Sequence, residues 1–405
     1  MSESTKTYHI LLVHCRYRLP GGEDAVFAAE RALLESHGHK VFVYERSNAE
    51  GGASRLLLPL RAVFSLRTMR DIRTLIRRHH IDLVHVHNTL LVISPSVFTA
   101  CRLAGVPVVQ TLHNFRLFCP NGILLRDGHV CEDCPRRSLL CAVRHGCYRG
   151  SRAQSAVCAA IYAFHRLLGT YRHVNLIALT PFDRDKLLEF NARRPVFDPA
   201  RLYVRPNGVD DTDPPLPWAA RDNCIVMAGR LEELKGVRTA LEAWKLLGPD
   251  APRLIVAGTG PLEGWMHRHA PGTVTFVGQL PHRELAALLA RCQAVLCPSL
   301  CYESFALVPA EAHAAGTPAL VSDLGNVGAA VREGVDGLHF APGDAASLAD
   351  AVRRLAGLGP TLDLPAIRRD ALQAYGRQTG YRRLIEIYQQ ILGDAHKAPA
   401  SGGTL

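Results

Sequence analysis

The 405-residue chain contains no apolar run of about 18 residues, so we expect no transmembrane helix. Residues 1–7 are polar and lead directly into the first apolar stretch, unlike a secretory leader. Without a leader, we expect the 12 cysteines to stay reduced rather than to form disulfides. These features predict a cytoplasmic protein.

Acidic residues are scarce in the first half of the chain. Residues 1–200 hold 27 Lys and Arg against 16 Asp and Glu, a formal charge of +11, whereas residues 201–405 hold 20 and 21. A charge excess in one half indicates an anionic partner for that half: a membrane surface, an acidic acceptor or nucleic acid. An arginine-rich surface without such a partner is the other interpretation.

Part of this charge lies in residues 55–78, where seven arginines occur with one acid, Asp71, and leucines are interleaved. A basic, partly amphipathic segment can lie on the anionic inner face of the plasma membrane. The alternative is a solvated helix face at about residues 66–79.

Short apolar runs alternate with helical patterns in both halves, and this alternation predicts parallel α/β domains. In the first half, the expected strands are residues 8–15, 40–45, 82–87, 107–113, 175–180 and 201–209. In the second half, they are residues 224–228, 253–257, 273–277, 293–298 and 318–322. The sequence therefore predicts two doubly wound parallel sheets.

Residues 210–222 are rich in Asp and Pro, as is typical of a linker between domains. This places an N-terminal domain at residues 1–209 and a C-terminal domain at residues 223–365. A long helix at residues 366–392 is expected to return to the N-terminal domain, ahead of a disordered tail at residues 393–405.

Candidate ligand-binding residues follow the first expected strands. Gly21 and Gly22 occupy a strand–loop–helix junction, where bare backbone can approach a phosphate. The alternative, which a Gly-Gly pair alone favours, is a simple tight turn. His87 and His113 end two strands. Ligands bind beyond the carboxyl ends of the strands in open α/β sheets, so both histidines are candidates for a cleft. The alternative is a structural, hydrogen-bonded role.

A Cys-rich insertion at about residues 115–151 interrupts the alternating pattern. Cys131 and Cys134 have the spacing that lets two thiolates reach one tetrahedral metal ion. Cys119 and Cys147 flank this pair and would complete a structural zinc site with four ligands. The alternative is an insertion with reduced cysteines.

Glu303 and Glu311 are separated by seven residues, near the expected start of a helix at residues 304–315. Backbone N–H groups at a helix start attract anions. On one unbroken helix the two carboxylates would lie about 12 Å apart along the axis, too far for an acid–base pair. We therefore expect Glu303 in the loop and Glu311 about two turns into the helix, each on a different part of a polar ligand.

Several motifs of the second half occur in one order: Gly229-Arg230-Leu231 with Lys235-Gly236, Gly258-Thr259-Gly260-Pro261, Phe276-Val277-Gly278, Glu303 with Glu311, and Gly316-Thr317-Pro318. Together they resemble the retaining glycosyltransferases of family 4 (glycosyl transferases group 1), which have the GT-B fold of two Rossmann-like domains facing a central cleft. The first half extends the resemblance through Gly21-Gly22-Glu23, Thr111-Leu112-His113-Asn114 and Pro206-Asn207-Gly208-Val209-Asp210. The Cys-rich insertion resembles one found in some bacterial members.

The resemblance implies a nucleotide-diphosphate sugar as the donor and no cofactor for catalysis. No Asp-x-Asp motif occurs at a plausible metal site, and Arg230 and Lys235 would neutralise the departing diphosphate. Glu303 would bind sugar hydroxyls, and His113 would contact the transferred sugar. The other residues implied to bind the donor are Gly21, Gly22, Gly229, Gly258, Gly260, Val277, Ser304, Phe305, Ala306, Leu307 and Glu311.

The implied reaction is transfer with retention of configuration to a polysaccharide, lipopolysaccharide or lipid-linked acceptor on the basic first domain, without a nucleic-acid partner. Two alternatives stay open. An epimerase, hydrolase or phosphorylase would use the same fold. A basic nucleic-acid-binding protein with a structural metal site would explain the positive charge of the first half and the Cys131–Cys134 pair. It would leave Glu303 and Lys235 unexplained.

Overall fold

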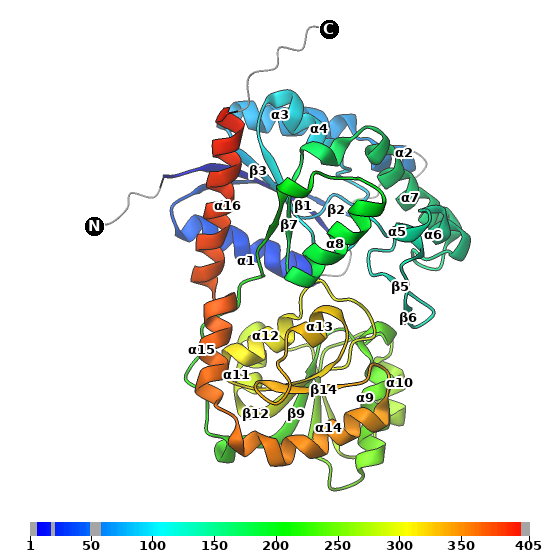
Figure 1. Ribbon diagram of the computed structural model, residues 1–405, viewed down its shortest axis with the longest axis vertical. Helices are drawn as coiled ribbons and strands as arrows, with labels where there is room; N and C mark the ends of the chain where they lie inside the picture. Colours follow the sequence, from blue (N-terminus) through cyan, green and yellow to red (C-terminus); the bar gives the residue numbers. More distant parts are fainter. Residues whose placement is uncertain (1–5, 18–20, 49–57, 398–405) are drawn as a thin grey trace. The chain divides into compact units, whose positions relative to one another are not determined.

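The computed structural model describes residues 6–17, 21–48 and 58–397 (Figure 1). The chain divides into two compact units. The first comprises the chain up to Gly122, Glu132–Arg205 and the end from Tyr381. The second comprises Ile123–Cys131 and Pro206–Gly380.

The first unit contains a six-stranded parallel sheet with the order β2-β1-β3-β4-β7-β8. Its strands are β1 (His9–Arg16), β2 (Lys40–Ser47), β3 (Leu83–Val86), β4 (Val108–Thr111), β7 (Asn175–Ala178) and β8 (Leu202–Val204). The helices of its α/β framework are α1 (Gly22–Ser36), α2 (Leu58–Val63), α3 (Leu66–His79), α4 (Ser96–Ala104), α7 (Arg152–Leu167) and α8 (Pro181–Arg193). β3 and β7 are buried along their whole length, as expected for parallel strands covered on both faces.

The predicted insertion follows β4. It contains a hairpin of two short strands, β5 (Leu125–Arg126) and β6 (His129–Val130), and the short helices α5 (Asp133–Arg136) and α6 (Leu140–His145).

The second unit contains another six-stranded parallel sheet, with the order β11-β10-β9-β12-β13-β14. Its strands are β9 (Asp222–Ala228), β10 (Arg253–Ala257), β11 (Val274–Gly278), β12 (Cys292–Cys297), β13 (Ala319–Ser322) and β14 (Gly337–Phe340). Its helices are α9 (Val237–Leu247), α10 (Glu263–His269), α11 (His282–Arg291), α12 (Leu307–Ala314), α13 (Gly325–Ala329), α14 (Ala345–Leu358) and α15 (Leu364–Tyr375). The strand order reverses between β9 and β12, the position at which ligands bind in open α/β sheets.

The long helix predicted at residues 366–392 is two helices, so this prediction was wrong. α15 ends at Tyr375, and α16 (Arg377–Lys397) begins after Gly376. Gly376 is extended and forms a parallel bridge with Val209, which ends the helical hydrogen-bond pattern. From Tyr381 onward, α16 belongs to the first unit, where Leu384 and other apolar residues pack against the core of β1 and α1.

Two predicted boundaries also differ from the structure. The expected linker at residues 210–222 is bound to the second unit, because Asp210 contacts His282 at 3.0 Å and the Thr212 hydroxyl donates to the Ala314 carbonyl at 3.0 Å. α16 continues to Lys397, so residues 393–397 are helical rather than a disordered tail. Residues 398–405 lie outside the described residues.

Candidate active site

The loop between β9 and α9 reaches the end of β12 through a close backbone contact. A Cβ atom at Gly236 would lie 1.8 Å from the carbonyl oxygen of Pro298, and Gly236 has a φ of +66°. Glycine alone accommodates both this approach and this conformation. The contact continues where the Leu300 amide donates to the Leu234 carbonyl oxygen at 2.8 Å. Lys235 is therefore held beside the segment that follows β12.

Lys235 and Glu303 form an ion pair where the strand order reverses. Lys235 Nζ lies 2.9 Å from Glu303 Oε1, and both side chains are partly buried. The Ser299 hydroxyl donates to the same carboxylate, and the Asn326 side-chain amide donates to the backbone oxygen of Glu303 at 2.5 Å. Burial by itself lowers the pKa of Lys235, but the Glu303 carboxylate raises this pKa well above its usual value. Lys235 is thus a fixed positive charge.

Arg230 lies on the same loop and is exposed to solvent. The structure therefore brings Lys235 to Glu303 but leaves the Arg230 guanidinium at the surface. A Cβ atom at Gly258 would lie 1.9 Å from the Gly229 carbonyl oxygen, with φ at +147°. These two glycines let the loops after β9 and β10 pack backbone to backbone, which is a structural reason for their presence.

Glu311 lies on α12 and lines a small pocket with Asp210, Thr212 and His282. Burial raises the pKa of Glu311 to about 7, and the neighbouring His282 opposes this rise. Glu311 Oε1 lies 3.9 Å from His282 Nδ1, and His282 Nε2 lies 3.0 Å from Asp210 Oδ2. His282 was not predicted from the sequence, and its one signal there is its position directly after Pro281 at a helix start.

The predicted helix start at Ser304 was wrong. α12 begins at Leu307, because the backbone of Ala306 (φ −80°, ψ 74°) lies outside the helical region. Ser304 and Phe305 therefore belong to the loop with Glu303. Glu311 lies about one turn into the helix rather than two.

In the first unit, the start of α1 lies beside the loop after β4. Asn114 Nδ2 donates to Glu23 Oε1 at 2.8 Å, which joins the two predicted motifs. The Gly21 amide donates to Asp24 Oδ2 at 2.8 Å, so a carboxylate of the chain itself already occupies this donor. The binding of a phosphate at Gly21 and Gly22 remains a prediction.

His87 and His113 line a polar pocket at the carboxyl ends of β3 and β4. His87 Nδ1 lies 3.0 Å from His113 Nε2. The other polar residues that line this pocket are Asn88, Thr89, Gln110, Thr111, Asn114, Arg116, Tyr162 and Tyr171. Arg116 Nη1 donates to the Tyr17 hydroxyl at 2.9 Å, while Arg116 Nε and Gln110 Oε1 are buried and have no hydrogen-bond partner among the described residues. The two strand-end histidines are thus joined at the wall of a hydrogen-bonding pocket.

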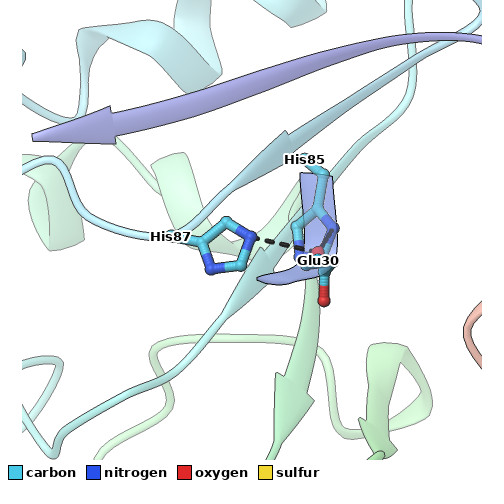
Figure 2. A group of neighbouring side chains, drawn as sticks. All are labelled: Glu30, His85 and His87. Atoms are coloured by element: carbon cyan, nitrogen blue, oxygen red, sulfur yellow. Dashed lines mark hydrogen bonds and ion pairs between the residues drawn. The ribbon is translucent and has the colours of Figure 1, made fainter. Parts of the chain in front are cut away.

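Behind this pocket, Glu30 of α1 contacts both His85 of β3 and His87 (Figure 2). Glu30 Oε1 is 2.9 Å from His85 Nδ1 and 3.1 Å from His87 Nε2. Across the part of the chain that the structure describes, this is the one group of three or more His, Cys, Asp or Glu ligand atoms within 4.8 Å of one another. A metal ion is therefore one candidate occupant.

The partners of this group favour a hydrogen-bond network instead. The buried Arg205 guanidinium pairs with the second oxygen of Glu30. His85 contacts the Tyr388 hydroxyl at 2.7 Å and the Thr111 hydroxyl at 2.8 Å. Burial raises the pKa of Glu30, but His85 and Arg205 outweigh burial and hold it well below its usual value. The carboxylate charge is thus already compensated by protein groups.

Comparison with known proteins identifies the family to which the two sheet-containing units belong. Residues 20–213 match the family described as Glycosyltransferase Family 4, and residues 222–357 match the family described as Glycosyl transferases group 1. The chain belongs to glycosyltransferase family 4. The solved structure of HepE from Anabaena in complex with UDP-glucose has a TM-score of 0.62 and 18% identity, covering 96% of this chain and all of HepE. The predicted GT-B fold is confirmed.

Two curated relatives align with this family 4 chain over different extents. A glycogen synthase of Mycobacterium tuberculosis is 42% identical over 167 residues, which is 38% of this chain and 39% of the relative. D-inositol 3-phosphate glycosyltransferase 1 of Catenulispora acidiphila is 28% identical over 342 residues, which is 78% of this chain and 74% of the relative. The alignment thus spans less than half of the glycogen synthase.

The cysteines of the family 4 chain form no disulfide. Cys119 and Cys134 are buried, and burial raises the pKa of Cys134 to about 12, with the thiols of Cys119, Cys141 and Cys147 adding to the rise. These four thiols therefore lie near one another, although no three cysteines in the described residues meet the 4.8 Å spacing. The zinc site with Cys131 as a ligand remains a prediction.

Proposed function

We propose that this protein transfers a sugar from a nucleotide-diphosphate sugar to a glycan or lipid-linked acceptor, with retention of configuration. The Lys235–Glu303 ion pair at the strand-order reversal of a family 4 chain carries this proposal. The UDP-glucose in the structure of HepE and the glycosyl-transfer names of the two relatives support it.

Lys235 and Arg230 supply the positive charge that the leaving diphosphate needs as the glycosidic bond breaks. Glu303 holds Lys235 in place and accepts hydrogen bonds from hydroxyls of the transferred sugar. Glu311 binds the ribose hydroxyls of the donor. The glycine-rich loops around Gly229, and the amides at the start of α12, let the backbone approach the phosphates.

We propose an acceptor at an anionic membrane surface, as in the assembly of cell-envelope polysaccharide. On α3, exposed arginines such as Arg67 and Arg70 lie opposite the buried Ile72 and Ile76. Three leucines of α2, α3 and α7 are also exposed: Leu60, Leu66 and Leu167 are 70%, 75% and 86% exposed. Basic and apolar groups together are suited to anionic lipid. Arg55, Leu56 and Leu57 of the predicted segment lie outside the described residues.

No described helix has the length and apolar character needed to cross a membrane.

A donor screen tests the function. Thermal unfolding of the full chain is measured with UDP-, GDP- and ADP-sugars, because a ligand that binds the folded state raises its apparent stability. We expect one donor class to raise the melting temperature and to yield a glycosylated product with an acceptor, in the presence of EDTA as well. Binding followed only by hydrolysis, phosphorolysis or epimerisation of the sugar would favour the other enzyme classes and contradict the proposal.

A further inference from the structure

A chain of three side chains links a buried carboxylate to the pocket of the first unit. Glu30 Oε1 lies 3.1 Å from His87 Nε2, and His87 Nδ1 lies 3.0 Å from His113 Nε2. Glu30 and His87 are buried, whereas His113 is partly exposed and lines the pocket. The three residues come from α1, the end of β3 and the loop after β4.

The geometry of the two rings is that of an edge-to-edge hydrogen bond. The planes of His87 and His113 differ by 19°, and their centroids are 5.2 Å apart while the two nitrogens are 3.0 Å apart. Rings stacked face to face would not bring single edge nitrogens together in this way. One nitrogen must therefore donate a proton and the other must accept it.

The carboxylate decides the direction of these hydrogen bonds. Arg205 pairs with Glu30 and keeps it ionised, so the carboxylate only accepts and His87 Nε2 must carry the proton. Burial lowers the pKa of His87 to about 4 and that of His113 to about 3, so both rings are neutral at pH 7. A neutral imidazole with a proton on Nε2 has a lone pair on Nδ1, so His87 Nδ1 accepts from His113 Nε2.

We propose that Glu30 and His87 are positioning residues that fix His113 in the tautomer with a proton on Nε2. His113 Nδ1 is then a hydrogen-bond acceptor, which suits a hydroxyl group of the transferred sugar and not a phosphate oxygen. This assignment rests on the proposed function for the identity of the ligand. The tautomer itself rests only on the chain of hydrogen bonds.

An isosteric change at the buried end reverses the chain. In Glu30→Gln the amide can donate to His87 Nε2, which then puts the proton of His87 on Nδ1 and turns His87 Nδ1 into a donor. His113 Nε2 must accept from it, so the proton of His113 moves to Nδ1. The pocket then meets a donor where the wild-type protein offers an acceptor.

The test is ¹⁵N NMR of the full chain with labelled histidine at pH 7, with the His113 signal assigned through His113→Asn. We expect a neutral His113 with the proton on Nε2 in the wild type, and on Nδ1 in Glu30→Gln. The control is Tyr388→Phe, which removes a hydroxyl from His85 but leaves the chain intact and should leave the His113 tautomer unchanged.

A wild-type His113 that is charged or protonated on Nδ1 would overturn the proposal, and this result does not depend on whether Glu30→Gln folds. An unchanged tautomer in folded Glu30→Gln, or a changed one in Tyr388→Phe, would overturn the role of Glu30. With the donor from the screen, kcat should fall roughly 10- to 100-fold in Glu30→Gln while the thermal shift caused by the donor persists. A wild type without transfer activity would count against the proposed function alone, because the NMR result is independent of turnover.

Discussion

The Lys235–Glu303 pair shows how single residues in this protein balance one another. Each charge is partly removed from water, which would be costly for either alone, and the 2.9 Å contact compensates for that cost. A diphosphate arriving at this position would find a positive charge that is already oriented and needs no reorganisation. For Glu311, in contrast, the compensating group within the described part of the chain is His282, whose Nδ1 lies 3.9 Å from Glu311 Oε1.

Glu311 leads to a pH-dependent prediction. Its folded-state pKa of about 7 is above the usual value for a glutamate, so the folded state favours the protonated form. The wild type should therefore lose stability as the pH rises from about 4.5 to about 7, relative to Glu311→Gln, by roughly 1–3 kcal/mol.

Denaturant unfolding at pH 5 and pH 8 measures this difference. Glu284→Gln, at an exposed carboxylate of α11, controls for the loss of one negative charge. If Glu311→Gln and wild type differ equally at both pH values, the pKa of Glu311 is not raised in the folded state.

Single candidate residues were predictable from the sequence where they belong to a local motif. Lys235 precedes Gly236 in the loop after β9, Glu303 lies in the loop after β12, and Glu311 lies in the first turns of α12. The relation between Glu30 and His87 was not predictable, because these residues are 57 positions apart. Their contact depends on how α1 packs on the sheet, which no local pattern specifies.

At the scale of elements, most strands were predictable and helix ends were less so. Residues 254–257 are a continuous apolar run and, with Arg253, form β10 as expected. β14 was missed because Gly337–Phe340 is short and contains a histidine. The break at Gly376 was missed because it depends on a bridge to Val209, which is distant in the sequence.

The surface formed by α2, α3 and the end of α7 leads to a prediction of membrane binding. Leu60→Ser combined with Leu167→Ser should reduce sedimentation with phosphatidylglycerol vesicles about tenfold or more, since each change removes an apolar side chain worth about 1–2 kcal/mol of insertion. Vesicles of phosphatidylcholine should bind the wild type weakly.

The control is Leu246→Ser, which removes an exposed leucine from α9 in the second unit. Equal sedimentation of the double variant and the wild type, or equal binding to both lipids, would contradict membrane docking through this surface.

The Cys-rich insertion leads to a prediction about metal content. If Cys119, Cys131, Cys134 and Cys147 bind zinc, elemental analysis of anaerobically purified protein should find about one zinc per chain. Cys131→Ser with Cys134→Ser should remove this metal, whereas Cys141→Ser, outside the predicted ligand set, should retain it. Wild-type protein without bound metal would contradict the predicted zinc site and support the alternative, an insertion with reduced cysteines.

At the scale of the whole molecule, the chain repeats one architecture twice. Each unit has a six-stranded parallel sheet, and candidate ligand-binding residues such as His113 and Lys235 lie in segments that follow its strands. The charge excess of the first half and the ion pair of the second half therefore belong to separate units with separate candidate ligands. This division was predictable from the alternating pattern and the charge count, whereas the exact start of the second unit at Pro206 was not.

The central claim is that Lys235 stabilises a leaving nucleoside diphosphate during sugar transfer. The most direct measurement is the rate of glycosylated product formation for wild type, Lys235→Ala and the control Glu233→Gln. Glu233 lies on the same loop as Lys235, and this control breaks its exposed ion pair with Arg238 of α9. We expect a loss of about 100-fold or more in folded Lys235→Ala and a rate within about twofold of wild type in Glu233→Gln. A Lys235→Ala variant that transfers sugar at nearly the wild-type rate would contradict the central claim.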